Sequence, residues 1–368
     1  MILIPIMGTS PTATGVSTGD AGALPSSPEE LTQAYLTSAL QTRLPGAVVT
    51  DCRHEPLGGE QGIASAPTRL RLTSDDPAVP ATMIAKLPPS HPGAQAQLHA
   101  MGFFLREVGF YRSLADLTPL ATPRCYGAQL DADTGGALLL LEDLAPARNG
   151  SWVEGSSVDD IALVLLSLAR MHARWWEDPA VVDAPWLTLT SMLAPSAVAE
   201  VLQRAWPTFL ARLGLPVDDG IRSTRDWISS TLHEASVTLF ETGPRTLVHN
   251  DVQADNLFFP ADPARSVVLV DWQLATYGRC VVDVASAIQA NLPVPLRRRA
   301  EPELLRHYHE ALVGEGVRDY SWERCRADYE LATVIAPGRL ASAVGLHPGL
   351  AAHHGAPWDR VFPRFVRT

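Results

Sequence analysis

A polar loop followed by two short apolar runs is the feature that most constrains the fold of this 368-residue chain. The loop begins at His249; the first apolar run, Leu-Phe-Phe, covers residues 257–259, and the second covers residues 267–270. The segment between them starts with Pro-Ala-Asp-Pro, which predicts a turn. We therefore predict two short antiparallel strands, with the start of the first beside the end of the second.

This hairpin places three polar side chains. Asn256 precedes the first strand, Asp271 follows the second, and Asp251 lies five residues before Asn256. Asn256 and Asp271 are predicted to lie close enough to share one cation, and oxygen ligands suit magnesium rather than zinc. Phosphoryl transfer needs such a set, because one carboxylate orients the attacking hydroxyl while an amide and a second carboxylate hold magnesium. A lone Asp at a strand end is more often a turn former, but this spacing indicates catalysis.

Further upstream, the chain carries residues that a nucleotide site would use. A glycine-rich segment with Gly58, Gly59 and Gly62 lies between two predicted strands, where the backbone can approach phosphates closely. Such glycine clusters are much commoner in ordinary turns, so this segment indicates a nucleotide site only together with two residues downstream of it. Lys86 interrupts an apolar strand predicted at residues 83–88, and Glu107 lies on a helix predicted from about residue 94 to residue 115.

The polar loop and its hairpin resemble the catalytic region of the aminoglycoside phosphotransferase and choline-kinase-like group within the protein-kinase-like fold. Within that group, the chain looks most like the ecdysteroid-kinase-like branch, and the resemblance covers about residues 28–335. It implies Asp251 as the catalytic base and Asn256 and Asp271 as magnesium ligands. The group usually has Gly between the His and the Asp, where this chain has Asn250. Asn tolerates the left-handed backbone conformation better than most residues.

The same resemblance suggests roles for the upstream residues. Lys86 resembles the strand lysine that contacts nucleotide phosphates in kinases, although a solvated lysine is the ordinary explanation. Glu107 lies in a segment that resembles the kinase helix whose glutamate pairs with that lysine. We therefore predict a Lys86–Glu107 ion pair. Residues Glu142 to Leu144 end an apolar strand and resemble the hinge between lobes, whose backbone would bind the nucleotide base.

These elements predict an α+β chain with the two-lobed protein-kinase-like fold. Residues 1–27 are predicted to be a disordered leader, because residues 8–27 are mostly Gly, Ser, Thr, Ala and Pro. Residues 28–145 are predicted to form an N-terminal nucleotide-binding lobe with an antiparallel sheet. Residues 146–368 are predicted to form a larger, mainly helical C-terminal lobe for catalysis and acceptor binding.

Three helix starts are predicted from capping residues. Ser27, followed by Pro and two Glu, predicts a helix that begins there. Asp159 or Asp160 predicts the start of a second helix, whose apolar stripe includes His172, interpreted as a packed core histidine rather than a ligand. Asp283 fits an N-cap, and it resembles the structural Asp that steadies the catalytic loop of kinases.

Composition limits the possible partners and location. The net charge of −11 argues against a nucleic-acid partner and against an acidic membrane surface. The four cysteines have no close pairs, which fits reduced thiols and no zinc site. The apolar first residues lack the charged region of a signal peptide, and no run reaches spanning length, so a cytoplasmic location and no membrane partner are expected.

Together these features predict a kinase that uses Mg2+ and transfers the γ-phosphate of ATP or GTP to a hydroxyl of a small molecule. An antibiotic is the first acceptor to consider, on family association alone, and would make the protein a resistance phosphotransferase. An amino alcohol or a sterol-like metabolite is the alternative, and a cationic acceptor would suit the net charge. A nucleotide-binding pseudokinase is a different class of function, which only Asn250 favours.

Overall fold

The computed structural model describes residues 24–57, 66–189, 195–213, 217–262, 266–346 and 361–366. The segment with Gly58, Gly59 and Gly62 lies outside these residues, and so do residues 1–23 of the predicted leader.

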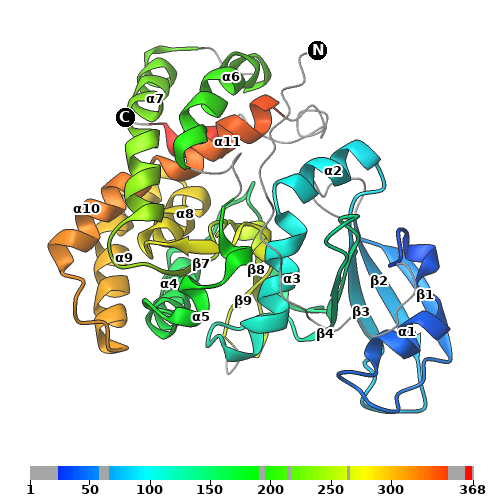
Figure 1. The fold of residues 1–368 in the computed structure, drawn as a ribbon. Helices are drawn as coiled ribbons and strands as arrows, with labels where there is room; N and C mark the ends of the chain where they lie inside the picture. The colour runs from blue at the N-terminus through cyan, green and yellow to red at the C-terminus, as the bar shows by residue number, and fades with distance from the viewer. Residues whose placement is uncertain are drawn as a thin grey trace.

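A five-stranded antiparallel sheet forms the first part of the fold (Figure 1). Its strands are β1 (Asp51–Pro56), β2 (Ala66–Thr73), β3 (Thr82–Leu87), β4 (Cys125–Leu130) and β5 (Ala137–Glu142). They lie in the order β1-β2-β3-β5-β4, and each neighbouring pair is antiparallel. The predicted sheet is therefore confirmed.

Strand β5, which lies between β3 and β4, separates two cores, because alternate side chains of a strand point to opposite faces. Leu138 and Leu140 pack in a small outer core with α1 (Gln33–Leu40). Leu139 and Leu141 pack in the main core, which includes α3 (Phe103–Ser113) and the apolar residues of the catalytic hairpin. The sheet thus joins α3 to the hairpin at residues 257–270 through one continuous core.

The helix predicted at about residues 94–115 is two helices, so that prediction is wrong in its continuity. α2 (Pro92–Ala100) ends before Gly102, where φ is 72°, and α3 starts at Phe103. Glycine adopts this left-handed conformation without steric cost, which lets the chain turn between the helices. Glu107 therefore belongs to the second of these helices, α3, which packs against β4 and β5.

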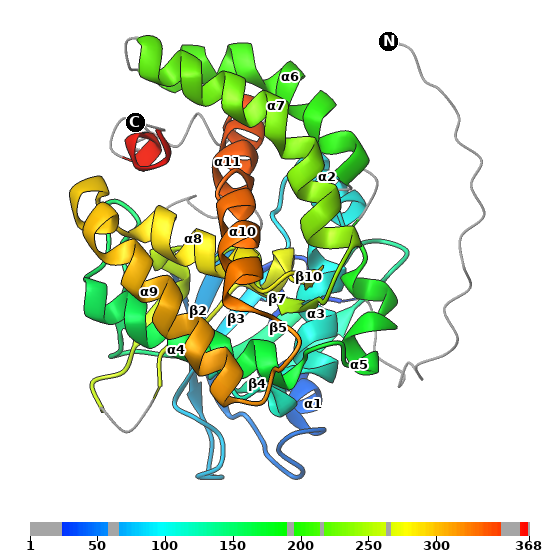
Figure 2. The ribbon, with the colours of Figure 1, turned by 90° about the vertical axis from the view of Figure 1, so that its left-hand side faces the viewer.

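The second part of the chain is mainly helical. Its helices are α4 (Val158–Arg174), α5 (Pro179–Val182), α6 (Pro195–Leu213), α7 (Asp219–Glu241), α8 (Val281–Asn291), α9 (Val294–Gly314), α10 (Trp322–Ala332) and α11 (Ile335–Leu346). Its short strands are β6 (Arg148–Asn149), β7 (Thr246–Val248), β8 (Leu257–Phe259), β9 (Val268–Leu269) and β10 (Thr276–Gly278). Figure 2 shows α6, α7 and α11 gathered at one end, where they contact one another. None of the described helices is both long and apolar enough to cross a membrane. The predicted lobe boundary at residues 145 and 146 stays a prediction.

Two predicted helix starts are displaced. Ser27 precedes only a 3-10 turn, Pro28–Glu30, and α1 begins after Thr32, whose Oγ1 accepts the N–H of Tyr35 at 3.3 Å. The cap of α4 is Ser157, whose Oγ accepts the N–H of Asp160 at 3.0 Å.

The helix dipole explains the displacement in α4. Acidic residues are favourable throughout the first helical turn, where they face the positive end of the helix dipole. Asp159 and Asp160 therefore mark the start of α4 without capping it. The third predicted cap is also wrong, because Asp283 is the third residue of α8 and its N-cap position is Cys280.

Gly109 allows a close approach between α3 and Trp186, which lies in the 3-10 helix Pro185–Leu187. A β-carbon at position 109 would lie 2.5 Å from Cδ2 of Trp186, far inside a relaxed carbon contact. Gly109→Ala is therefore expected to lower the free energy of unfolding by about 1–3 kcal/mol, measured by urea denaturation. Gly314→Ala is the control, because nothing lies within 4 Å of that β-carbon. Equal stability of the two variants would contradict the predicted contact.

Candidate active site

The predicted catalytic hairpin is present. β8 and β9 are antiparallel, with Leu257 opposite Leu269 and Phe258 opposite Val268. The N–H of Val270 donates to the backbone oxygen of Asn256 at 3.0 Å, which closes the end of the hairpin. Asn256 and Asp271 consequently lie at this same end, as the strand pairing predicted.

Asn256 is oriented by Asp251. Its Nδ2 donates to the backbone oxygen of Asp251 at 2.9 Å and to the carboxylate Oδ2 at 3.2 Å. Both contacts use the amide nitrogen of Asn256, and its role as a magnesium ligand stays a prediction. Asp271, with a φ of 68°, follows the second strand and supplies a carboxylate at the same end.

Asp283 holds the backbone at the start of the catalytic loop. This carboxylate is fully buried, and it accepts the N–H of His249 at 2.8 Å and the N–H of Asn250 at 2.6 Å. His172 Nε2 lies 3.2 Å from Oδ2 of Asp283, and His172 Nδ1 lies 2.7 Å from the hydroxyl of Tyr308. The interpretation of His172 as a buried core residue is therefore confirmed, and the contact expected between Asp283 and the loop is present.

Asn250 adopts the left-handed conformation that its neighbours require. Its φ is 67°, and its Nδ2 donates to the backbone oxygen of Leu274 at 3.3 Å. Among residues other than Gly, Asn is one of the few that adopt this conformation readily. Asn250 thus has a backbone conformation that Gly also adopts readily.

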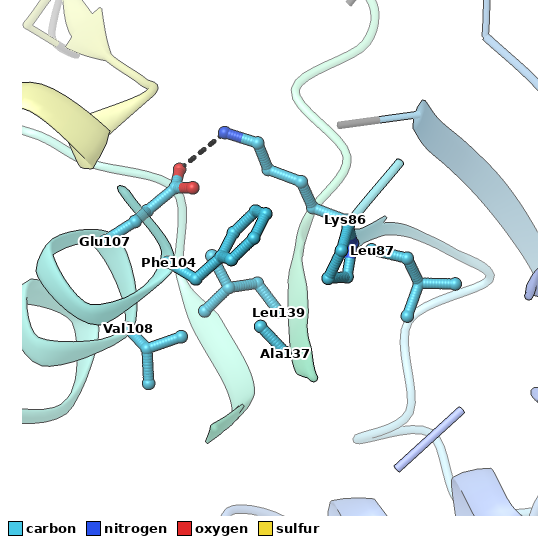
Figure 3. A pocket seen from close by; sticks show the side chains of 8 residues that line it. Lys86, Leu87, Phe104, Glu107, Val108, Ala137 and Leu139 are labelled. Carbon is cyan, nitrogen blue, oxygen red and sulfur yellow. Dashed lines mark hydrogen bonds and ion pairs between the residues drawn. The ribbon is translucent and has the colours of Figure 1, made fainter. Parts of the chain in front are cut away.

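Lys86 forms the predicted ion pair with Glu107, and it also contacts Asp271. Its Nζ lies 2.7 Å from Oε1 of Glu107 and 2.6 Å from Oδ1 of Asp271. Figure 3 shows the Lys86 ammonium directed at Glu107 beside Phe104, in a small cavity that also includes Val108 and Leu139. Burial by itself would lower the pKa of Lys86, but the charges of Asp271 and Glu107 raise it above its usual value.

A sequence signal for Lys86 went unused. Lys86 is the only lysine in the chain, whereas arginine occurs throughout the sequence. A compact ammonium can bridge two carboxylates in a narrow space, whereas a planar guanidinium cannot take the same position. This difference explains why Lys occurs at this position.

Sequence reasoning also missed the contacts that fix α3 to the catalytic hairpin. Trp272 stacks on Phe110, with ring centroids 3.6 Å apart and an interplanar angle of 7°. Arg106 is buried, and its Nε donates to the backbone oxygen of Gln273 at 2.9 Å. These contacts tie the helix that carries Glu107 to the segment that follows Asp271, so both carboxylates reach Lys86.

The charge of Arg339, on α11, acts on Asp251. Burial raises the pKa of Asp251 to about 6, and the positive charge of Arg339 in α11 opposes that shift. Sequence reasoning did not identify Arg339. The available signal was a single charged residue in an otherwise uncharged helix.

The predicted hinge residues are at the end of β5. The N–H of Glu142 donates to the oxygen of Arg124 at 2.8 Å, and the oxygen of Leu144 accepts the N–H of Ala147 at 2.8 Å. The N–H of Glu142 is therefore used in strand pairing, and base binding by this backbone stays a prediction. Next to it, Arg69 Nε donates to Oδ2 of the buried Asp143 at 2.6 Å, which ties β2 to this segment.

The comparison with protein families agrees with this geometry. The model of the phosphotransferase enzyme family matches residues 60–327, which is most of the chain. The chain belongs to this family. It is thus a phosphotransferase with an alcohol group as acceptor, as predicted, while its assignment to the ecdysteroid-kinase-like branch stays a prediction.

Solved structures confirm the kinase-like fold of this phosphotransferase. A candidate aminoglycoside phosphotransferase from Ralstonia eutropha aligns with a TM-score of 0.53 and 16% identity, covering 90% of this chain and 94% of that chain. The complex of APH(2″)-IIIa with GDP and kanamycin aligns with a TM-score of 0.52 and 13% identity, covering 90% of this chain and 95% of that chain. Ethanolamine kinase from Plasmodium vivax aligns with a TM-score of 0.50 and 10% identity, covering 90% of this chain and 85% of that chain. A comparison with curated protein sequences finds no significant match.

Proposed function

We propose that this phosphotransferase transfers the γ-phosphoryl group of ATP or GTP to a hydroxyl of a small molecule, with Mg2+ as cofactor. The observation that carries the proposal is the convergence of Asp251, Asn256 and Asp271 at one end of the hairpin, with Lys86 contacting Asp271. These side chains match the base, the metal ligands and the phosphate-binding cation that phosphoryl transfer uses.

Asp251 orients the acceptor hydroxyl and accepts its proton. The acceptor oxygen forms the new P–O bond, the bond from the γ-phosphorus to the bridging oxygen breaks, and the nucleoside diphosphate leaves. Because the transferred group carries most of its charge on oxygen, positioning and electrostatic stabilisation provide the rate. Lys86 binds the phosphate oxygens, and Glu107 sets the position of its ammonium.

Asn256 and Asp271 fit a magnesium ion. They offer an amide oxygen and a carboxylate, and magnesium in nucleotide sites usually takes one or two such protein ligands together with phosphates and water. The described residues contain no cluster of three or more His, Cys, Asp or Glu side chains that would form a metal site without the nucleotide. Magnesium, when bound with the nucleotide, would neutralise phosphate charge.

The nucleotide and the acceptor are parts of this proposal. APH(2″)-IIIa is described in complex with GDP and kanamycin, which supports a purine nucleotide and keeps an antibiotic among the acceptors. The similarity to an ethanolamine kinase keeps an amino alcohol among them. We place the activity in the cytoplasm, where nucleoside triphosphates are available. The φ of 67° at Asn250, in a region that Gly also adopts readily, supports an active kinase over a nucleotide-binding pseudokinase.

The experiment is to measure nucleoside diphosphate release with Mg2+ and ATP or GTP across a panel of hydroxylated acceptors. The panel spans aminoglycosides, macrolides, nucleoside antibiotics, amino alcohols, sterols and hydroxy acids. Acceptor-dependent release that stops when the metal is chelated would support the proposal. Nucleotide binding without release for any acceptor would favour the pseudokinase, and failure to bind either nucleotide would overturn the proposal.

Lys86→Met is expected to lower kcat/KM by about 10²- to 10³-fold, the usual effect of removing one group that stabilises developing charge. The substitution removes the ammonium that contacts Glu107 and Asp271 while keeping an unbranched side chain. Steady-state kinetics with the best acceptor from the panel would measure it. Arg53→Met is the control, since Arg53 is exposed on β1 of the same sheet. Equal kinetics in the two variants would exclude Lys86 from the nucleotide site.

A further inference from the structure

The segment at residues 361–366 is anchored in the core of the second part of the chain. Its 3-10 helix, Phe362–Phe365, contacts α8, and the ring of Phe362 meets that of Phe209 on α6 with centroids 4.9 Å apart. Arg364 lies in this 3-10 helix and is only 6% exposed, although arginine is seldom buried in proteins. A buried guanidinium needs hydrogen-bond acceptors, so the partners of Arg364 indicate what it does.

The guanidinium of Arg364 joins two segments. Nη1 donates to the backbone oxygens of Ala290 at 2.7 Å and Trp152 at 2.5 Å, and Nη2 donates to that of Val153 at 2.8 Å. Ala290 lies in the last turn of α8, where carbonyl groups lack partners within the helix and the helix dipole favours a cation. The other two acceptors belong to residues 150–157, which we call the linker loop because they connect β6 to α4. Arg364 therefore fixes the linker loop to the end of α8.

The linker loop in turn bonds the catalytic loop on both sides of Asn256. The N–H of Gly150 donates to the backbone oxygen of Leu257 at 2.8 Å. The N–H of Trp152 donates to Oδ1 of Asp255 at 2.7 Å. Trp152 thus accepts from Arg364 through its oxygen and donates to the catalytic loop through its nitrogen, so one peptide segment connects the two.

The linker loop is also packed tightly between the catalytic loop and α8. A β-carbon at Gly150 would lie 2.3 Å from the backbone oxygen of Ala254. The N–H of Ser156 donates to the backbone oxygen of Asn291, the last residue of α8, at 2.8 Å. Nδ2 of Asn291 donates to the backbone oxygen of Val252 at 3.0 Å. A displacement of the linker loop therefore cannot be absorbed by free space and moves the backbone of the catalytic loop.

We propose that Arg364 is a positioning residue for phosphoryl transfer, which acts through the linker loop and Asp255 to fix Asn256 and Asp251. Asn256 transmits the position directly, because its Nδ2 donates to the backbone oxygen and to Oδ2 of Asp251. This inference rests on the proposed function of Asp251 and Asn256. Transfer requires the reacting atoms to be held in close alignment, so a small shift of the loop lowers the rate.

Arg364→Gln is expected to lower kcat by about 10- to 100-fold, the effect of a misplacement of about 1 Å far from the chemistry. The KM for the nucleotide is expected to stay nearly unchanged, because Glu107 on α3 positions Lys86 and the linker loop does not. Arg364→Lys is expected to restore part of kcat, since an ammonium keeps the charge and several donors but loses the planar fork. Steady-state kinetics well below the melting temperature would measure both variants.

Arg318→Gln is the matched control. Nη1 of Arg318 also donates to a backbone oxygen in the last turn of a helix, that of Val313 in α9, at 3.0 Å. Arg318 is exposed, and its replacement should leave kcat at the wild-type level. Wild-type kcat in Arg364→Gln, with or without a lower melting temperature, would overturn the inference, because Arg364 would then only stabilise the fold.

Asp255→Ala tests the same connection from the other end. Asp255 is exposed, so its replacement does not threaten the core, yet it removes the acceptor of the Trp152 N–H. We expect a lower kcat, and we expect the double variant with Arg364→Gln to lose less than the product of the two single effects, because both act through one connection. If neither Arg364 variant folds, wild-type kcat in Asp255→Ala would contradict the proposal.

Amide hydrogen exchange separates failure of this inference from failure of the proposed function, because it requires no turnover. In Arg364→Gln, peptides that cover residues 150–157 and 250–257 are expected to exchange about 10- to 100-fold faster, the range for a lost hydrogen bond to a charged group. Peptides from α10 should keep the wild-type rate. Faster exchange at residues 250–257 would support the connection even if no acceptor were phosphorylated. Unchanged exchange there would overturn it and leave the kinase proposal standing.

Discussion

Asp251→Asn is expected to reduce phosphoryl transfer by about 10²- to 10⁴-fold, the range that a positioned general base contributes. Asn has nearly the same shape as Asp and can still hydrogen-bond the acceptor hydroxyl, but it cannot accept its proton. Steady-state nucleoside diphosphate release, measured with the same acceptor as the wild type, would give the size of the effect.

The stability of this variant provides an internal check. Burial raises the pKa of Asp251 to about 6, so the charged carboxylate is disfavoured in the folded protein. Removing that charge is expected to leave the melting temperature unchanged or to raise it. A loss of activity with an intact fold and unchanged nucleotide affinity would identify a catalytic group.

Asp159→Asn is the matched control for Asp251→Asn. Asp159 is an exposed residue in the first turn of α4, and its replacement should leave activity at the wild-type level. Wild-type turnover by Asp251→Asn would remove Asp251 from the mechanism, and the proposed function would then need a different base.

Asp283→Ala is expected to lower the free energy of unfolding by about 3–5 kcal/mol, the usual cost of breaking a buried charge contact. Asp283 is fully buried, and its carboxylate accepts two backbone N–H groups of the catalytic loop. The substitution leaves the N–H groups of His249 and Asn250 buried without an acceptor, and His172 loses one of its two partners. The loop that carries Asp251 would then lose its fixed position.

Urea denaturation and activity, both measured well below the melting temperature, would test this expectation. Asp226→Ala is the control, because Asp226 is exposed on α7 and forms an ion pair with its neighbour Arg225. An Asp283→Ala protein with wild-type stability and wild-type kinetics would show that these hydrogen bonds contribute little. Reduced stability with full activity would show that Asp283 stabilises the fold but is not needed to position the catalytic loop.

The catalytic hairpin could be predicted from the sequence because its determinants are local. Two apolar runs and a turn define β8 and β9, and their pairing brings Asn256 and Asp271 to one end without further information. The conformation of Asn250 is local as well, because few residues other than Gly adopt it readily. The Lys86–Glu107 pair is a long-range contact, and it was predictable only through the resemblance to the kinase template.

Local signals were less reliable for the ends of helices. Three residues near the start of α4 have side chains that favour a helix start: Ser157, Asp159 and Asp160. They lie within three residues of one another, so the sequence does not decide which side chain accepts the capping hydrogen bond. The break at Gly102 was missed for a similar reason, because a single Gly within a helical pattern does not by itself decide whether the helix continues. Asp283 resembled a cap, yet its carboxylate bonds a loop 33 residues away in sequence.

The sequence by itself determined the family, the catalytic hairpin and the residues that form it, since these follow from spacing and from the hydrophobic pattern. Only the tertiary structure decided that Asp271 shares Lys86 with Glu107, that Trp272 stacks on Phe110, and that the charge of Arg339 acts on Asp251. The physical reason is that burial, charge and hydrogen bonding between distant segments depend on how the helices pack, and a pattern of neighbouring residues does not record that packing.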